Sequence, residues 1–337
     1  MKQYDLYGIG NALVDIEAST TEVFLSDNNV IKGCMSLVDA SRQNHLLSNL
    51  RSQIEHKSCG GSVANSTIAT ANFGGNCFFS CVVADDEMGR FFHRDLHHKK
   101  IDTNLDSQPL ISGNTGTCLA MITPDADRTM NTFLGVGGLV GIQHINENAA
   151  AQSKVIFLEG YLISSDSGLA AMQHLIDISK SNKSICAISL SDPMLVKSFR
   201  NRFIDMIKSG IDLIFMNEEE AFALSETRSI DEAFNWLRQN CSTFIITCGK
   251  EGCVGWDGKQ KLHTRAQKIN KLDTIGAGDM YAGSFIYAII KGLSYQEAAE
   301  IACYCASLIV GQYGPRFESK NLKKAKLFLE NYQQLTA

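Results

Sequence analysis

The sequence lacks the features that mark a secreted or membrane-bound protein. Its first residues, MKQYDLYGIGNALVDI, contain no basic stretch, long apolar run or small-residue cleavage site, and no run of about 18 apolar residues occurs elsewhere. The 11 cysteines are odd in number and mostly lie in apolar strings such as CFFSCVVA, where a thiol behaves as a small hydrophobic side chain. We therefore expect a cytoplasmic protein without disulfides.

Signatures of structural metal and of nucleic acid binding are also missing. No two cysteines have the two-residue gap of a zinc knuckle, and the eight histidines do not stand near cysteines at zinc-finger spacing, so we expect no structural metal. The net charge of -5 arises from 31 basic and 36 acidic residues scattered along the chain, which disfavours a cationic face. We expect small-molecule partners, with no binding to nucleic acid or membrane.

The sequence has few of the residues that mark a flexible boundary between domains. Only four prolines occur, and there is no Gly/Ser linker and no internal repeat. The length of 337 residues allows one large α/β domain or two smaller ones. Short apolar runs alternate with longer segments of helical period, which is the pattern of βαβ units. The sequence therefore predicts an α/β fold with a doubly wound, mostly parallel sheet.

The predicted strands are apolar runs that end in Gly, Asn, Asp or another small residue, at 4–10, 77–84, 154–160, 185–191, 212–217 and 243–249. Helices are predicted over 62–73, 87–99, 167–181, 196–208 and 230–240, and three more begin near Gly276, Ser294 and Ser319. Two stretches break the rhythm, and in one of them GTCLAMIT and RTMNTFLG flank PDAD as in a β-hairpin. We assign 1–16, 39–110 and 136–337 to an α/β domain, and 17–38 and 111–135 to a small β lid over the ligand cleft.

The strongest chemical signal is DTIGAGD, residues 273–279, which is followed by a segment with apolar positions at helical spacing. Gly276 and Gly278 let the backbone approach a ligand where a helix begins, so that free N–H groups and the positive end of the helix dipole face an anion. Asp279, in the first helical turn, is then a candidate to take a proton from an attacking alcohol. A glycine pair followed by Asp also suits a plain helix cap.

The full string resembles the DTxGAGD signature of PfkB, or ribokinase-like, kinases, with no departure at its defined positions. The resemblance implies a three-layer ribokinase-like fold and transfer of the γ-phosphoryl group of MgATP to a hydroxyl. It implies that Asp279 is the catalytic base and that the amides of Gly276, Ala277 and Gly278 stabilise the transferring phosphoryl group. Dependence on K⁺ near Asp273 is a property of some relatives, and the sequence leaves it open.

Two motifs resemble the sugar-binding elements of that family. GNALVD is similar to the opening of adenosine kinases, which implies that Asn11 and Asp15 bind the ribose; a carboxylate can accept hydrogen bonds from two vicinal hydroxyls. CGGSVANS resembles the GGxxxN element, which implies that Gly60 and Gly61 lie against the sugar and that Asn65 bonds a hydroxyl. Without the family resemblance, these residues equally suit turns or helix caps.

The hairpin of the lid carries a further resemblance. GNTGTCLAMI is similar to the TGTC stretch of adenosine kinases, whose small and apolar side chains face the purine. This implies a substrate wall made by Cys118, Met121, Phe133 and Leu134, although alternating apolar residues in a hairpin often form only its buried face. Arg128 lies in the turn, where we expect it to be solvated.

Three segments resemble the nucleotide-binding elements of the family. MNEEEA is similar to NxxE, which organises Mg²⁺ and the phosphates largely through water, although a run of acids also suits a helix N-terminus. TCGKEGCVG is similar to TxGxxG, with a plain hairpin as the alternative, and CYCASLIVGQYG matches the helix near the adenine. The implied ATP-binding residues are Asn217, Glu220 (which would hold Mg²⁺), Thr247, Gly249, Gly252, Thr274, Ser307 and Gly314, with Lys250 as an added charge. The P-loop and protein-kinase motifs are absent.

The spacing N-x-x-x-D and the TGTC hairpin resemble adenosine kinases more than the N-x-D opening of ribokinases. The resemblance therefore implies phosphorylation of the 5′-hydroxyl of a ribonucleoside, adenosine first, and a role in purine salvage. A kinase for free ribose, fructose or a keto-deoxy sugar acid is the alternative. A regulatory binder that has lost catalysis is less favoured, because a binder needs no base in the anion site. Both a monomer and a homodimer are compatible with the sequence.

Overall fold

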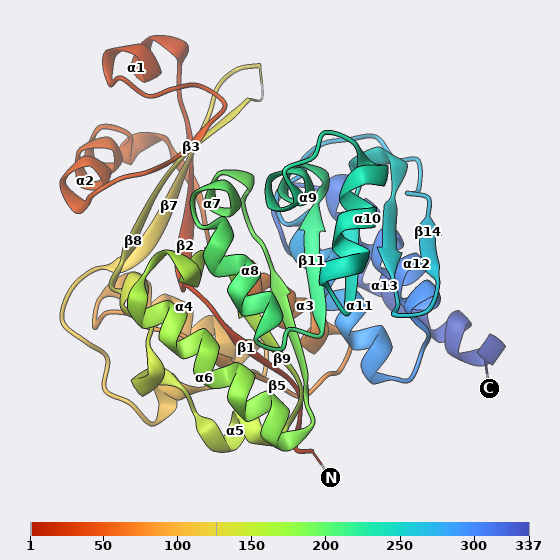
Figure 1. Cartoon of the computed structure of the whole chain (residues 1–337). Helices are drawn as coiled ribbons and strands as arrows, with labels where there is room; N and C mark the ends of the chain where they lie inside the picture. The colour runs from red at the N-terminus through yellow and green to blue at the C-terminus, as the bar shows by residue number, and fades with distance from the viewer. Residues whose placement is uncertain (1, 126, 337) are drawn as a thin grey trace.

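The computed structural model describes residues 2–125 and 127–336 of the chain, and within them the backbone forms two sheets. A nine-stranded sheet has the order β14-β13-β12-β11-β10-β9-β1-β5-β6, and a five-stranded sheet has the order β3-β8-β7-β2-β4. Figure 1 shows the second sheet projecting from the body of the molecule, with helices α1 (Glu22–Asp27) and α2 (Ala40–Asn49) at its far end. We call this second sheet with its two helices the lid.

The large sheet is mostly parallel. Its parallel strands are β1 (Tyr4–Ile9), β5 (Cys77–Ser80), β6 (Asp102–Thr103), β9 (Ser153–Glu159), β10 (Ile185–Ser189), β11 (Leu213–Asn217) and β12 (Thr243–Thr247). Two antiparallel strands, β13 (Cys253–Trp256) and β14 (Lys261–Thr264), complete one edge. Because side chains alternate along a strand, β9 sends Val155 and Phe157 into one hydrophobic cluster, and Ile156 and Leu158 into another.

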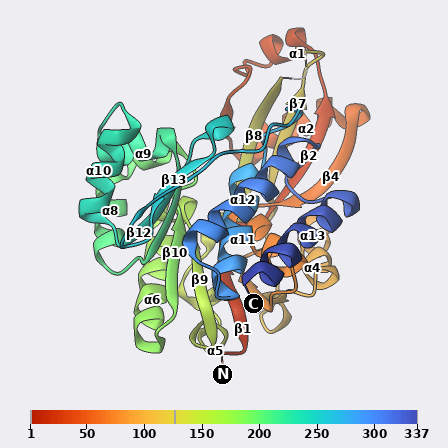
Figure 2. The same cartoon turned by 90° about the vertical axis from the view of Figure 1, so that its right-hand side faces the viewer.

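Helices cover both faces of this sheet. One face is covered by α3 (Ser62–Asn72), α4 (Glu87–His98), α11 (Ala277–Ile290), α12 (Tyr295–Val310) and α13 (Ser319–Thr336), several of which face the viewer in Figure 2. The other face is covered by α5 (Glu147–Ala151), α6 (Asp166–Asn182), α7 (Pro193–Ser198), α8 (Arg200–Lys208), α9 (Glu218–Ser225) and α10 (Ile230–Asn240). The prediction of a three-layer, doubly wound α/β fold is confirmed.

The predicted helix over 196–208 differs from the structure, which has two helices, α7 and α8, in this segment. Asp192 caps α7 and Pro193 occupies its first turn, a position where the missing N–H of proline costs nothing. The break falls at Phe199, whose φ of -119° and ψ of 26° lie outside the helical range. Because apolar residues keep a helical spacing across Phe199, the sequence pattern did not reveal the break between α7 and α8.

The lid contains the predicted hairpin and more. Strands β7 (Thr115–Ile122) and β8 (Arg128–Gly135) pair antiparallel, as expected, while Ala126 of the PDAD turn lies outside the described residues. The sheet also takes in β2 (Leu13–Ser19), β3 (Met35–Leu37) and β4 (Ile54–Gly60). Strand β4 and the start of β2 come from ranges that we assigned to the α/β domain, so the sheet is larger than the predicted lid; the division into two domains stays a prediction.

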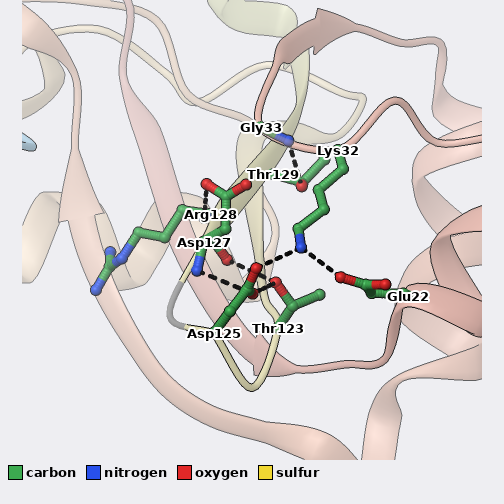
Figure 3. Close-up of polar contacts among 8 residues, drawn as sticks. All are labelled: Glu22, Lys32, Gly33, Thr123, Asp125, Asp127, Arg128 and Thr129. Carbon is green, nitrogen blue, oxygen red and sulfur yellow. Dashed lines mark hydrogen bonds and ion pairs between the residues drawn. The ribbon is translucent and has the colours of Figure 1, made fainter.

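A charged cluster ties the tip of the lid together. The ammonium group of Lys32 lies 2.6 Å from the carboxylate of Glu22 and 2.5 Å from that of Asp125. The hydrogen bond from Lys32 holds the pKa of Asp125 at about 2. Figure 3 shows that Arg128, although it begins β8 beside this cluster, directs its guanidinium group away from Lys32. The cluster therefore leaves Arg128 free for a contact elsewhere.

The described helices were also compared with the length and hydropathy that a bilayer requires. None of them, within residues 2–125 and 127–336, is both long and apolar enough to cross a membrane.

Candidate active site

Asp279 lies at the start of α11, and two side chains of α3 hold its carboxylate. Ser62 donates a hydrogen bond of 2.7 Å to one carboxylate oxygen, and Asn65 donates one of 3.0 Å to the other. Gly276 caps the helix with φ of 72°, a left-handed conformation that favours glycine, and a Cβ there would overlap Pro315. The structure therefore brings Asn65 and Asp279, which are far apart in sequence, into direct contact.

Burial raises the pKa of Asp279 to about 6, although the hydrogen bonds from Asn65 and Ser62 and the positive charge of Arg316 oppose this shift. A carboxylate with that pKa is mostly ionised at neutral pH, yet it holds a proton far better than an exposed Asp does. This combination suits a general base, which must accept a proton during reaction and release it afterwards.

Ala277 and Gly278, which directly precede Asp279, line a cavity of about 590 Å³, a volume typical of small-molecule sites. Apart from its neighbours in the chain and the backbone of its own helix, no described residue places an atom within 4 Å of where a Cβ of Gly278 would stand, so this turn is open on that side. Six predicted nucleotide-binding residues line the same cavity: Thr247, Gly249, Lys250, Gly252, Thr274 and Ser307. Sequence reasoning missed its apolar wall, to which Ile269, Tyr281, Ala306 and Val310 contribute.

Asn217 and Glu220 do not line this cavity, but they stand beside one end of it. Asn217 pairs in the sheet with Thr247, and it forms a capping box with Glu220 at the start of α9. The amide group and the backbone N–H of Asn217 donate to the two carboxylate oxygens of Glu220, at 2.8 and 3.0 Å. Both proposed roles of this motif, helix cap and polar ligand, are thus compatible with the observed geometry.

Three other carboxylates lie close enough to Glu220 to affect its ionisation. Burial raises the pKa of Glu220 to about 7, and the negative charges of Asp192, Asp279 and Glu219 raise it further. Such mutual repulsion is relieved by a bound cation, and oxygen ligands are those that Mg²⁺ prefers. Each oxygen of Glu220 keeps a second lone pair beside the bond from Asn217, so it can accept from a metal-bound water. The donor set therefore fits Mg²⁺ held through water.

Asp15, the other predicted carboxylate, extends from strand β2 toward the same region. Burial raises its pKa to about 7, Arg316 and Arg128 oppose this, and the charges of Asp279 and Glu17 add to it. A Cβ on Gly60 would overlap the Asp15 carboxylate, and a Cβ on Gly61, where φ is 98°, would overlap the backbone oxygen of Asn11. The glycine pair thus lets β4 pass close to both predicted sugar-binding residues.

Glu159, at the end of β9, is a site residue that sequence reasoning missed. It is 1% exposed, and it accepts hydrogen bonds from the backbone and the side-chain amide of Asn11, at 3.0 and 2.8 Å. Its second oxygen accepts from the backbone of Val63 in the first turn of α3, at 3.1 Å. Burial raises the pKa of Glu159 to about 7. Glu159 therefore fixes both Asn11 and the start of the helix that carries Asn65.

Arg316 is the second residue that sequence reasoning missed. Its Nε donates to the Asn65 oxygen at 3.1 Å, and one terminal nitrogen donates to Asp95 of α4 at 2.5 Å. The other terminal nitrogen is buried without a partner in the part of the chain that the structure describes. The charge of Arg316 opposes the rise in the pKa of both Asp15 and Asp279, and Arg128 assists it at Asp15, so these cations favour the ionised form of two neighbouring carboxylates.

The lid wall differs from the expectation at two positions. Asp15 pairs with Cys118, and Cys118 with Thr132, so by alternation Leu134 shares their face of the sheet. Phe133 pairs with Thr117 and therefore lies on the alternate face, and Met121 is fully buried in the cluster beneath α1 and α2. The strand register, which the sequence did not reveal, thus separates Met121 and Phe133 from the wall beside Asp15.

The expectation that Arg128 is solvated is wrong. Its side chain is 14% exposed and lies 3.0 Å from the carboxylate of Glu17 and 3.3 Å from that of Asp273. Asp273 also accepts hydrogen bonds from the backbone of Ile275 and Gly314, at 3.0 and 3.1 Å. Arg128 therefore connects the lid to the first residue of DTIGAGD. Gly314 contacts that loop through its hydrogen bond to Asp273 and does not line the cavity.

Comparison with known proteins relates the whole arrangement to a family. The sequence pattern of a family described as pfkB family carbohydrate kinase matches residues 33–322. Among solved structures, a probable sugar kinase from Rhizobium etli CFN 42 is 30% identical, with a TM-score of 0.90, and the match covers 97% of this chain and 99% of that one. An adenosine kinase from Sinorhizobium meliloti is 32% identical, with a TM-score of 0.88 and the same coverage. A ribokinase from Staphylococcus aureus (strain COL) is 27% identical over 262 residues, which cover 76% of this chain and 83% of that protein.

The raised pKa values of these carboxylates can be tested by measuring how the stability of the folded chain depends on pH. Asp279 and its buried neighbours bind protons more tightly in the folded chain than in the unfolded one, where carboxyl groups titrate near pH 4. Stability therefore falls as pH rises from about 4 to about 7. We expect Asp279→Asn, which removes one ionisation, to raise the Tm by roughly 2–5 °C at pH 8 and to leave it almost unchanged at pH 4.5.

Thermal unfolding followed by circular dichroism at both pH values measures this difference. The exposed Asp205 of α8 supplies the matched control, because Asp205→Asn removes a charge that folding does not bury. A lower Tm of the Asp279→Asn variant at pH 8 would show that this carboxylate is stabilised, not strained, by its surroundings.

Proposed function

The chain belongs to the pfkB family of carbohydrate kinases, and on that premise we propose that it transfers the γ-phosphoryl group of MgATP to the 5′-hydroxyl of a ribonucleoside, with adenosine favoured. The observation that carries the proposal is the position of Asp279. Its carboxylate contacts Ser62 and Asn65 on one side, while the adjoining Gly278 lines the cavity of about 590 Å³. An acceptor bound at Asn65 and a nucleotide bound in the cavity would meet at this carboxylate.

In the proposed reaction, Asp279 takes the proton of the acceptor hydroxyl as its oxygen attacks the γ-phosphorus and the bond to ADP breaks. The free N–H groups of Gly276, Ala277 and Gly278, at the positive end of α11, would stabilise the charge on the phosphoryl oxygens. Bound Mg²⁺ supplies further neutralisation of the phosphates, and Glu220 would hold it through water. Placement of the two substrates and of these groups supplies most of the acceleration.

The groups at the proposed acceptor site suit a substrate that carries a vicinal diol beside an apolar group. Asp15 and Asn11 offer hydrogen-bonding groups for two hydroxyls, and Glu159 holds Asn11 in place. Cys118 and Leu134, on the same face of the lid sheet as Asp15, would contact a base attached to the sugar. The adenosine kinase from Sinorhizobium meliloti, at 32% identity over nearly the whole chain, is consistent with this acceptor. A role in purine salvage follows from it.

Free-sugar kinase activity is the second candidate. It is favoured by the name of the ribokinase from Staphylococcus aureus and by that of the probable sugar kinase from Rhizobium etli. A free sugar would use Asn11, Asp15 and Asn65 in the same way, but it would leave the apolar lid wall without a contact. The two candidates therefore differ in whether removal of the base lowers kcat/KM.

A panel of acceptors decides between them. ADP release with MgATP should be measured for adenosine, inosine, guanosine, ribose and fructose, each with and without K⁺. We expect the highest kcat/KM for adenosine, at least ~10-fold above ribose, because a purine adds apolar contact area. We also expect little effect of K⁺, because Arg128 already places a positive charge 3.3 Å from Asp273. A higher kcat/KM for ribose or fructose than for adenosine would contradict the nucleoside proposal and favour free-sugar kinase activity.

Asp279→Asn tests the catalytic base. We expect kcat to fall by at least ~10² to 10⁴, the usual scale of general-base catalysis, with little change in acceptor affinity. Steady-state kinetics of the variant and of the Asp205→Asn control, with calorimetry for the affinity, measure both quantities. Near-normal turnover of the Asp279→Asn variant would remove Asp279 from the proton transfer.

Asp15→Ala tests the acceptor site. Loss of a carboxylate that bonds two hydroxyls should weaken adenosine binding by at least ~100-fold, because hydrogen bonds to charged groups contribute about 1.5–3 kcal/mol each. Isothermal titration calorimetry with adenosine measures this change directly. Glu22→Ala, which removes a carboxylate at the tip of the lid, is the control that should bind normally. Unchanged affinity of the Asp15→Ala variant would exclude Asp15 from the acceptor site.

A further inference from the structure

Three side chains with metal-binding atoms converge on the surface at the end of α4, away from the site described above. His93 and His97 project from one face of the helix, four residues apart, and Asp106 comes from the short 3-10 helix η2 (Asn104–Asp106). The Nε2 atoms of His93 and His97 lie 2.8 and 2.9 Å from the same oxygen of Asp106, and 3.0 Å from each other. We call these three residues the His-His-Asp cluster.

Protons alone do not satisfy all three contacts. The Asp106 oxygen, as a carboxylate, only accepts hydrogen bonds, so both Nε2 atoms must carry a hydrogen to donate to it. Two N–H groups then face each other across 3.0 Å without an acceptor between them. If one Nε2 lacks its hydrogen, its lone pair faces the Asp106 oxygen instead. A single cation at the centre is bound by all three lone pairs and removes this conflict.

The geometry also suits a metal ion. With metal–ligand distances of about 2.0–2.1 Å, neighbouring ligands stand roughly 2.9 Å apart around an octahedral ion and roughly 3.4 Å apart around a tetrahedral one. The observed separations of 2.8, 2.9 and 3.0 Å match the octahedral spacing. A small rotation of the exposed side chains would give the tetrahedral spacing. His pairs at i and i+4 lie on one helix face, which is the spacing of helical metal sites.

We propose that His93, His97 and Asp106 form a binding site for a divalent transition-metal ion such as Zn²⁺ or Ni²⁺. Two imidazole nitrogens and one carboxylate oxygen are the donors that such ions take, whereas Mg²⁺ and Ca²⁺ prefer oxygen alone. The side chains of His93, His97 and Asp106 are 25%, 53% and 41% exposed, so an ion can enter from solvent and water can complete its coordination.

The bound ion would connect the end of α4 to η2. Residues 99–103, between these two elements, include Lys100 with a positive φ of 58° and strand β6 at the edge of the large sheet. A metal bridge across this turn restrains it, and the ion stabilises the folded chain because the unfolded chain lacks the assembled site. Helix α4 also carries Asp95, which holds Arg316, so the restraint acts on an element that supports the candidate active site.

Calorimetric titration of the chelator-treated full chain with ZnCl₂ and, separately, NiCl₂ tests the proposal. We expect one equivalent to bind at the His-His-Asp cluster, and His93→Ala, His97→Ala and Asp106→Asn each to weaken it by at least ~10-fold. Zn²⁺ should also raise the Tm of the wild-type chain and slow amide hydrogen exchange over residues 99–106. These readouts do not depend on catalysis, so they stand whether or not the proposed kinase reaction is correct.

His98→Ala is the matched control, because His98 lies on the same helix, is exposed and belongs to no such cluster among the described residues. We expect this variant to bind Zn²⁺ like the wild type. Because the chain has 11 cysteines, the titration should be repeated after thiol alkylation. Binding that disappears on alkylation and persists in the His93→Ala/His97→Ala double variant would overturn the proposal, as would the absence of any binding by the folded wild-type chain.

Discussion

The arrangement of the candidate active site depends on keeping a group of carboxylates ionisable although they are buried or half-buried. Asp15, Glu159, Glu220 and Asp279 each have a pKa raised by burial, and the negative charge of Asp279 raises the pKa of the other three further. Such a group is costly to bury unless hydrogen bonds or cations compensate it. Donors from α3, from Asn11 and from Asn217, together with Arg316, supply that compensation. A bound Mg²⁺ would reduce the repulsion that remains among these carboxylates.

The distance between the two halves of the site is set by close packing of α3 against α11. A Cβ at Gly283 would overlap the backbone oxygen of Ser66, so the helices approach closely only because position 283 has no side chain. Two hydroxyls then bridge them: Ser66 donates to the backbone oxygen of Asp279, and Thr70 donates to that of Gly283, both at 2.9 Å. This contact holds Asn65 against Asp279, which places the expected sugar site beside the expected phosphate site.

Local sequence patterns predicted most of the α/β body, because a buried parallel strand and an amphipathic helix each carry their own periodicity. They also located the residues that stand at strand ends and helix starts, such as Asn217 and Asp279. What they missed depends on distant partners. Glu159 acts on Asn11 from 148 positions away, and Arg316 acts on Asn65 from 251 positions away. The register of β7 and β8, which places Phe133 on the face opposite Cys118, is likewise set by pairing between strands. It cannot be read from the spacing or composition of the sequence.

Arg128 shows how the lid and the phosphate-facing loop form one electrostatic unit. It shares its charge between Glu17, which lies two residues after Asp15 on strand β2, and Asp273, which begins DTIGAGD. Because the Arg128 and Asp273 side chains are both largely buried, separating them would leave charges without compensation. Arg128 therefore links strand β2 of the lid electrostatically to the start of DTIGAGD.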